Sequence, residues 1–307
     1  MNTPDPVGPL YLLPFDHRHS YLSGMFGLKP PLSLAQRARV IDSKRVIYEG
    51  FLAALAMGVP TAHAGILVDE EFGAELLRDA KSRGAITAVS VEQSGSAEFA
   101  FEYGDDFAAH LDAVAPTFAK VLVQFNIDGD MALNARQTER LARLSRWCRK
   151  RGQRLMFELL VKPTADQLAA AEGDLDRFDL AQRPALMHRA IEALQDAGVE
   201  PEVWKIEGLD RREDCERIVA SAQRGGRGHV GCIVLGRGAD EARVARWLST
   251  AASVPGFVGF AVGRTSFWNA VADFESGRAS RAQAATRVAA RFREWVDIFE
   301  KHGAPRV

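Results

Sequence analysis

Lys205 is the residue whose type and position most clearly predict chemistry in this sequence. It lies in the segment PEVWKIEGLD, near the end of a short apolar run and shortly before the turn residue Gly208. A lysine in an apolar strand must be buried with its charge or lose its proton. An unprotonated lysine amine condenses with ketones to form a Schiff base. The alternative is a strand-end lysine that extends its ammonium to solvent or pairs with Glu207.

Two further ionisable residues lie in apolar runs. Glu158 is flanked by Phe157 and Leu159 in RLMFELL, and Lys120 lies in AKVLVQF. A buried carboxylate needs a cation or a proton donor, and a raised pKa would suit Glu158 for general acid–base catalysis. A structural ion pair of Glu158 with Lys120 or Lys205 is compatible with catalysis, because a Lys–Glu–Lys cluster is one way to tune a Schiff-base site.

Short apolar runs alternate with longer amphipathic segments, and we count eight such units. The runs are 10–15, 61–68, 86–91, 119–125, 154–160, 202–206, 231–235 and 256–262, and the helix-like segments are 34–57, 71–83, 103–116, 134–151, 182–197, 211–224, 239–252 and 265–300, the last as two helices. Ser33 and Gln36 form a capping box that opens the first helix, and Asp179 is a plausible start for the fifth. Segments 16–32 and 92–102 are irregular.

Eight strand–helix units in about 300 residues predict a single-domain (β/α)8 TIM barrel over residues 1–307. The runs are apolar throughout, as in parallel strands buried on both faces. A doubly wound sheet is the competing architecture, but the first run ends in PFDHRHS and not in a glycine-rich loop.

In a TIM barrel the active site lies at the carboxyl ends of the strands. Polar residues in or after the other runs are Asp16, His17, Arg18, His19, His63, Asp69, Ser90, Glu92, Gln124 and Asn126. Runs seven and eight end in Gly236-Arg237-Gly238 and Gly263-Arg264-Thr265. Barrels frequently bind phosphate at these two loops through glycine N–H groups and a helix N-terminus, and arginine adds bidentate recognition.

A metal site is the less favoured interpretation of the histidines. His17 and His19 have a spacing that can serve a metal, but the residue between them is the cation Arg18. The three cysteines are scattered, with neither metal-ligand nor disulfide spacing, which fits a reducing cytoplasm. We therefore expect no metal and no organic cofactor.

The bulk composition narrows the class of protein. The chain is 47% hydrophobic and 26% charged with a formal net charge of −1, which is ordinary for a globular protein and gives no basic field for nucleic acid or membrane. The first residues have neither a basic nor a long apolar stretch, so they do not form a signal peptide. We expect a cytoplasmic protein with a small-molecule substrate. A homo-oligomer is possible.

The sequence resembles the class I aldolases of the tagatose-bisphosphate aldolase group. The order PFDHRH, AKVLVQF, FELL, VWKIE, LGRG and AVGRTSFW carries this resemblance. It is closest to the domain of unknown function fused to the sugar kinase of inositol catabolism, which is associated with 2-deoxy-5-keto-D-gluconate 6-phosphate aldolase activity. No kinase is attached here.

The resemblance implies a role for each matching residue. Lys205 would be the Schiff-base lysine, Glu158 the acid–base carboxylate, Lys120 the second active-site lysine, and Asp16 and Arg18 the first-strand D-x-R pair. We further expect the substrate to be bound by His17, His63, Gln124, Gly236, Arg237, Gly263 and Arg264, with Arg18 or His17 meeting its carboxylate.

The activity expected from the resemblance is cleavage of 2-deoxy-5-keto-D-gluconate 6-phosphate to dihydroxyacetone phosphate and malonate semialdehyde. An aldolase for a tagatose- or sulfofructose-type ketose phosphate would use the same chemistry. A metal-dependent aldolase is another alternative. A sugar-phosphate-binding domain that regulates a kinase would keep the two Gly-Arg loops but would need neither Lys205 nor Glu158.

Overall fold

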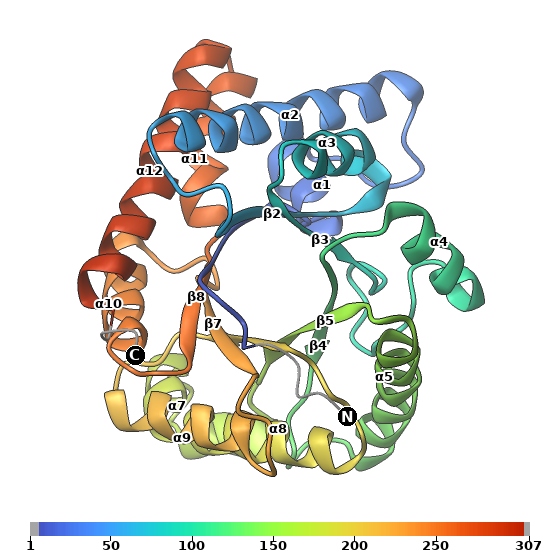
Figure 1. The fold of residues 1–307 in the computed structure, drawn as a ribbon, viewed down its shortest axis with the longest axis vertical. Helices are drawn as coiled ribbons and strands as arrows, with labels where there is room; N and C mark the ends of the chain where they lie inside the picture. Colours follow the sequence, from blue (N-terminus) through green and yellow to red (C-terminus); the bar gives the residue numbers. More distant parts are fainter. Residues whose placement is uncertain (1–5, 304–307) are drawn as a thin grey trace.

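The chain forms a closed barrel of eight parallel strands surrounded by helices (Figure 1). The computed structural model describes residues 6–303. The strands are β1 (Leu10–Pro14), β2 (Ala64–Val68), β3 (Ile86–Ser90), β4 (Phe118–Gln124), β5 (Arg154–Leu160), β6 (Val203–Glu207), β7 (Gly231–Leu235) and β8 (Phe257–Ala261). Strand β1 pairs with both β2 and β8, which closes the barrel. The predicted TIM barrel is therefore confirmed.

The helices follow the strands in the expected order. They are α1 (His19–Phe26), α2 (Leu34–Ala56), α3 (Glu70–Ser82), η1 (Gly104–Asp106), α4 (Phe107–Val114), α5 (Met131–Arg151), α6 (Ala165–Ala170), α7 (Leu175–Ala181), α8 (Arg183–Asp196), α9 (Arg212–Gln223), α10 (Glu241–Ala252), α11 (Arg264–Glu275) and α12 (Arg281–His302). The predicted capping box at Ser33 and Gln36 is present at the start of α2.

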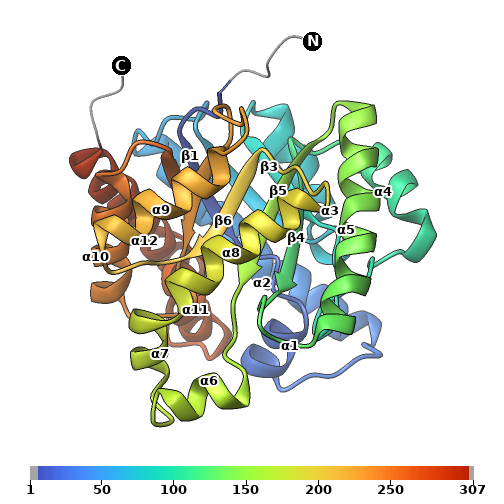
Figure 2. The ribbon, with the colours of Figure 1, turned by 90° about the horizontal axis from the view of Figure 1, so that it is seen from below.

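Three short helices were not predicted. Helix α1 lies in a segment expected to be irregular, and α6 and α7 lie in the connection between β5 and α8. Figure 2 shows all three beyond the carboxyl ends of the strands. The prediction that Asp179 starts the fifth helix is wrong: Asp179 belongs to α7, and α8 begins at Arg183 with Pro184 in its first turn. The carboxylate of Asp179 instead pairs with Arg183 and Arg237.

The interior of the barrel explains why the predicted catalytic residues converge. Leu12, Leu67, Ala88, Phe118, Met156, Val203, Ile233 and Ala261, one from each strand, belong to one buried cluster, so these side chains point inward. Strand side chains alternate between faces. Lys120, Glu158 and Lys205 follow inward residues by two positions and therefore point into the barrel one layer nearer its carboxyl end.

Trp204 and Phe157 have the opposite orientation. Both are fully buried in the larger core cluster, and their ring centroids lie 4.9 Å apart. This cluster fills the space between the strands and the helices, so the strands are apolar on both faces, as parallel strands in a barrel require. Within residues 6–303, none of the helices combines the length and apolar character needed to cross a lipid bilayer.

Candidate active site

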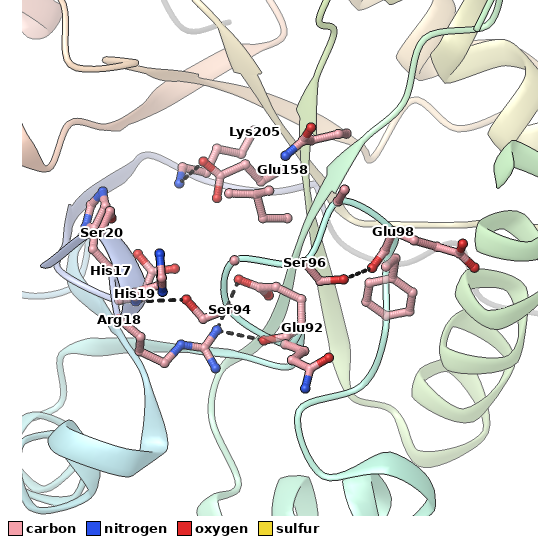
Figure 3. A pocket seen from close by; sticks show the side chains of 17 residues that line it. His17, Arg18, His19, Ser20, Glu92, Ser94, Ser96, Glu98, Glu158 and Lys205 are labelled. Atoms are coloured by element: carbon pink, nitrogen blue, oxygen red, sulfur yellow. Dashed lines mark hydrogen bonds and ion pairs between the residues drawn. The ribbon is translucent and has the colours of Figure 1, made fainter. Parts of the chain in front are cut away.

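Lys205, Glu158 and Lys120 form a continuous buried chain of charges. The Nζ atom of Lys205 lies 2.7 Å from Oε1 of Glu158, and the Nζ atom of Lys120 lies 2.8 Å from Oε2 of the same carboxylate. Strand register places these residues together, because Glu158 and Lys205 are direct partners in the pairing of β5 with β6. The predicted Lys–Glu–Lys cluster is present (Figure 3 labels Lys205 and Glu158).

Lys120 is surrounded by carboxylates. Besides Glu158, its ammonium lies 2.8 Å from Oδ2 of Asp16 and 2.9 Å from Oε1 of Glu92. The hydroxyl of Ser90 donates a hydrogen bond of 2.9 Å to Asp16. The side chain of Lys120 has no exposed surface. Its three ammonium hydrogens therefore each have a carboxylate to donate to, and the lysine is held in one position.

The network determines the charge state of its members. Burial alone would raise the pKa of Glu158, but the ammonium groups of Lys120 and Lys205 lower it below its usual value. The expected raised pKa of Glu158 is therefore wrong in direction, because two cations outweigh burial. Burial likewise acts to raise the pKa of Asp16, yet Lys120 and Lys205 hold it well below the ordinary value. The three neighbouring carboxylates raise the pKa of Lys120 despite its burial.

Lys205 and Glu158 lie where two halves of one cavity meet. The distal half, of about 230 Å³, is lined by Asp16, Arg18, Glu92, Gln124, residues 93–99, Lys205 and Glu158. The proximal half, of about 260 Å³, is lined by Leu160, residues 235–238, residues 263–265, Lys205 and Glu158. Both halves also contact His17, Ser20 and Leu122. A substrate bound across Lys205 would therefore place one end in each half.

The proximal half contains both Gly-Arg loops. Arg264 is the first residue of α11, which begins after Gly263 without a side-chain cap. The Nη2 of Arg264 donates a hydrogen bond of 3.1 Å to the backbone oxygen of Arg237, so the two loops touch. The predicted binding residues Gly236, Arg237, Gly263 and Arg264 thus line one side of the cavity together with Lys205.

Arg237 is already paired with two carboxylates. Its Nη1 donates to Oδ2 of Asp179, and its Nε lies 3.1 Å from Oε1 of Glu207. The fully buried Arg183 contacts the same two acids, with Nε 3.0 Å from Asp179 and Nη1 3.8 Å from Glu207. Two arginines and two carboxylates therefore form a closed ring of zero net charge. Within the described residues Arg264 pairs with no carboxylate, so it is the freer cation of the two loops.

Arg18 lines the distal half, but its terminal nitrogens are occupied. Nη1 donates to Oε2 of Glu102 at 2.6 Å. Nη2 donates to the backbone oxygen of Glu92 at 2.7 Å (Figure 3). Burial lowers the pKa of His17 to about 4, so its imidazole is neutral at pH 7 and offers hydrogen bonds but no charge. The expected role of either residue as the cation for a substrate carboxylate stays a prediction.

His63 lies outside the cavity. It precedes β2, at the amino end of the strand, and its backbone oxygen accepts a hydrogen bond from Tyr11. Its ring packs edge-on against Tyr11 at 6.3 Å. The prediction that His63 binds substrate fails on geometry. The strand runs from Ala64 to Val68, so His63 lies before its amino end, at the opposite end of the barrel from Lys205; the predicted run 61–68 also has His63 near its start. Gln124, by contrast, lines the distal half as expected.

Several polar residues of the site were not assigned from sequence. Glu92 was noted at a strand end, and its contact with Lys120 agrees with that position. Glu102, Asp179 and Arg183 come from connecting segments, where no periodicity relates a residue to the strand ends. Glu207 was considered only as a partner of Lys205, but its carboxylate accepts from the backbone N–H of Val161 and pairs with Arg237. Within the described part of the chain, no three His, Cys, Asp or Glu side chains are placed to hold a metal ion.

Fold and site together define a TIM barrel with a buried lysine–carboxylate network in a cavity at the carboxyl ends of its strands. The chain belongs to the family described as "Uncharacterized protein conserved in bacteria (DUF2090)", whose model matches residues 3–303. No curated protein matches the sequence.

Two solved structures have a similar fold. One is fructose-bisphosphate aldolase from Plasmodium falciparum, with a TM-score of 0.63, 12% sequence identity, and coverage of 98% of this chain and 93% of that chain. The other is a protein of Corynebacterium glutamicum, with a TM-score of 0.56, 17% identity, and coverage of 92% of this chain and 85% of that chain. At these identities the similarity shows the shared barrel.

Proposed function

We propose that the protein is a class I aldolase in which Lys205 forms a Schiff base with a phosphorylated ketose. The observation that carries this proposal is the contact of 2.7 Å between the Lys205 amine and the Glu158 carboxylate, inside a cavity large enough for a small sugar. A lysine paired with a base and open to a cavity is the arrangement that nucleophilic catalysis by an amine requires.

In the proposed reaction Glu158, ionised because of the two flanking ammonium groups, accepts a proton from Lys205. The free amine attacks the ketone carbon of the substrate to give a carbinolamine. Glu158 returns its proton to the carbinolamine hydroxyl, which leaves as water, and a protonated imine and an ionised Glu158 result. Glu158 or a water that it orients then removes the proton of the hydroxyl group beta to the imine carbon. The carbon–carbon bond breaks, the aldehyde leaves, and the bonding electrons form an enamine with the imine nitrogen. Protonation of the enamine carbon and hydrolysis release the ketone and regenerate Lys205.

Lys120 and Asp16 support this chemistry from one side of Glu158. Lys120 remains an ammonium because three carboxylates surround it. A fixed positive charge next to Glu158 stabilises the ionised form of that carboxylate, and so keeps a base beside Lys205. It also offers positive charge near the oxygen from which the proton is removed. Asp16 holds Lys120 in place and lines the cavity itself.

We place the substrate phosphate in the proximal half. Gly236, Gly263 and the uncapped start of α11 supply backbone N–H groups there, and Arg264 supplies charge. Arg237 would add hydrogen bonds rather than net charge, because Asp179 and Glu207 neutralise it.

We propose 2-deoxy-5-keto-D-gluconate 6-phosphate as the substrate, with dihydroxyacetone phosphate and malonate semialdehyde as products. The resemblance of the strand motifs to the domain fused to the kinase of inositol catabolism supports this choice. Another ketose phosphate would serve the same site. A purely regulatory sugar-phosphate-binding domain is less well supported, because it gives no reason for a buried lysine to face both a carboxylate and the cavity.

The test is borohydride trapping with dihydroxyacetone phosphate, followed by peptide mass mapping. Reduction of the imine should leave a triose-phosphate adduct on Lys205, and Lys205→Ala should abolish it. Lys162→Ala is a matched control, because Lys162 follows β5 on the same face of the barrel but does not line either half of the cavity. An adduct on Lys120 or Lys162 would overturn the assignment of Lys205.

A further inference from the structure

The distal half of the cavity carries carboxylates but little available positive charge. Asp16, Glu92 and Glu98 line it, and each is an acid. Of the cations that line it within the described residues, Lys205 pairs with Glu158, and Arg18 pairs with Glu102 at 2.6 Å and with Glu92 at 3.6 Å. The neutral His17 adds none at pH 7.

Glu102 is fixed in its position opposite Arg18. Residues 92–102 fold back on themselves through a bridge between Glu92 and Phe101. The backbone N–H of Gln93 donates to Ala100, and that of Glu102 donates to Val91. Oε2 of Glu102 also accepts from the N–H of Ser94 at 3.2 Å. The closer of the two carboxylates that pair with Arg18 is therefore held in position by backbone contacts.

A phosphate that entered the distal half would lose its hydration without gaining a free cation, whereas a single carboxylate, such as that of the proposed substrate, could accept hydrogen bonds from neutral residues there such as Gln93 and Gln124. This cost is larger for a phosphate, which carries about −1.5 to −2 charges, than for a carboxylate, which carries one. Asp16, Glu92 and Glu98 add like-charge repulsion, although Lys120 and two surface arginines, Arg136 and Arg140, partly offset it. A binding site can be selective because it lacks a cation for the unwanted anion as well as because it provides one for the preferred ligand.

We infer that the Arg18–Glu102 pair makes the enzyme selective for ketose monophosphates, because it leaves no site for a second phosphate on the aldehyde-forming half of the substrate. This inference rests on the proposed function. Glu102 is then a specificity-determining residue that acts through Arg18. It contacts neither Lys205 nor Glu158, and its side chain is 28% exposed.

The test compares D-fructose 1-phosphate with D-fructose 1,6-bisphosphate in the wild type and in Glu102→Gln. Glutamine keeps the length of the side chain and an acceptor oxygen for Arg18 or Ser94. It removes the closer of the two carboxylates that pair with Arg18 and leaves Arg18 with Glu92 at 3.6 Å. The wild type should prefer the monophosphate by about tenfold or more in kcat/KM, and Glu102→Gln should reduce this preference by about tenfold through better use of the bisphosphate. Asp105→Asn is the matched control, because Asp105 lies three residues away, is 89% exposed and pairs with Arg143.

Where cleavage of either sugar is slow, the same preference is measured as the concentration that half-saturates the borohydride-trapped adduct on Lys205. A wild type that prefers the bisphosphate, or an unchanged ratio in Glu102→Gln, would overturn the inference. So would failure of both hexose phosphates to form the adduct while dihydroxyacetone phosphate forms it, because the distal half would then not receive the aldehyde part. Failure of dihydroxyacetone phosphate itself would count against the proposed function instead.

Discussion

Replacing Glu158 by glutamine tests the centre of the proposed mechanism. Glutamine has nearly the same shape, so the barrel interior needs no repacking. The substitution removes the carboxylate that accepts the proton of Lys205 at 2.7 Å. It also places the NH2 group of the glutamine amide next to one of the two ammonium groups, Lys205 or Lys120. Lys120 keeps Asp16 and Glu92 as partners, whereas within residues 6–303 no carboxylate other than Glu158 pairs with Lys205. Lys205, and not Lys120, should therefore be the lysine that is left without a carboxylate partner.

The expected effect follows from the role of a general base. Positioned proton transfer contributes about 10²–10⁴-fold to a rate, which corresponds to about 2.7–5.4 kcal/mol in activation free energy. We expect Glu158→Gln to lower kcat/KM for ketose phosphate cleavage by a factor within this range. Stability should fall by about 1–3 kcal/mol, because a buried ammonium loses its charged hydrogen-bond partner.

Steady-state cleavage of a ketose phosphate and thermal unfolding of the same preparations measure the two effects separately. Glu202→Gln is the control, since Glu202 precedes β6 at the opposite end of the barrel and bonds to the backbone N–H of Leu155. Its kcat/KM should remain within a factor of about three of the wild type. A folded Glu158→Gln variant that retains more than about a tenth of wild-type kcat/KM would refute the role of Glu158 as the base.

Three other predictions concern phosphate, pH and metal. Arg264→Ala should cost about 2–4 kcal/mol in kcat/KM for a phosphorylated substrate and much less for an unphosphorylated one. Arg237→Ala should cause a smaller phosphate-specific loss, because Asp179 and Glu207 already neutralise that arginine. Equal losses for both substrates would contradict phosphate binding. The folded state disfavours protonated His17, so stability should fall as pH drops from about 6.5 toward about 4, by up to about 1.4 kcal/mol per pH unit. Denaturant titrations should show a shallower pH dependence in His17→Gln, and an unchanged one would show that His17 is not responsible. Turnover should be unaffected by a chelator, and restoration of a chelated, inactive enzyme by added zinc would refute the metal-independent mechanism.

The sequence predicted the barrel and the catalytic layer well because both depend on short-range patterns. Apolar runs bounded by turns define the strands, and every second residue of a strand shares one face. This period places Lys120, Glu158 and Lys205 on the inner face together with Phe118, Met156 and Val203. Errors at strand boundaries were small. His63 was wrongly expected at the site because a histidine in an apolar run was counted without regard to its place near the amino end of that run.

Contacts made by the connecting segments could not be predicted in the same way. Asp179 reaches Arg237 from α7, and Glu102 reaches Arg18 from a folded loop. Neither contact has a sequence period, because each depends on how an irregular segment crosses the carboxyl face. The direction of the pKa shift of Glu158 also could not be predicted from the sequence, because it depends on the number of cations within hydrogen-bond distance and not on burial alone.

The burial of Lys120 among three carboxylates has a consequence for covalent ligands. Two lysines lie beside Glu158, yet only Lys205 lines the cavity, while Lys120 is fully covered and donates to acids on every side. An electrophile designed to capture an amine in this pocket therefore meets a single reactive partner. The structure thus favours labelling with one-to-one stoichiometry, and the same arrangement keeps the substrate ketone away from Lys120, which lines neither half of the cavity.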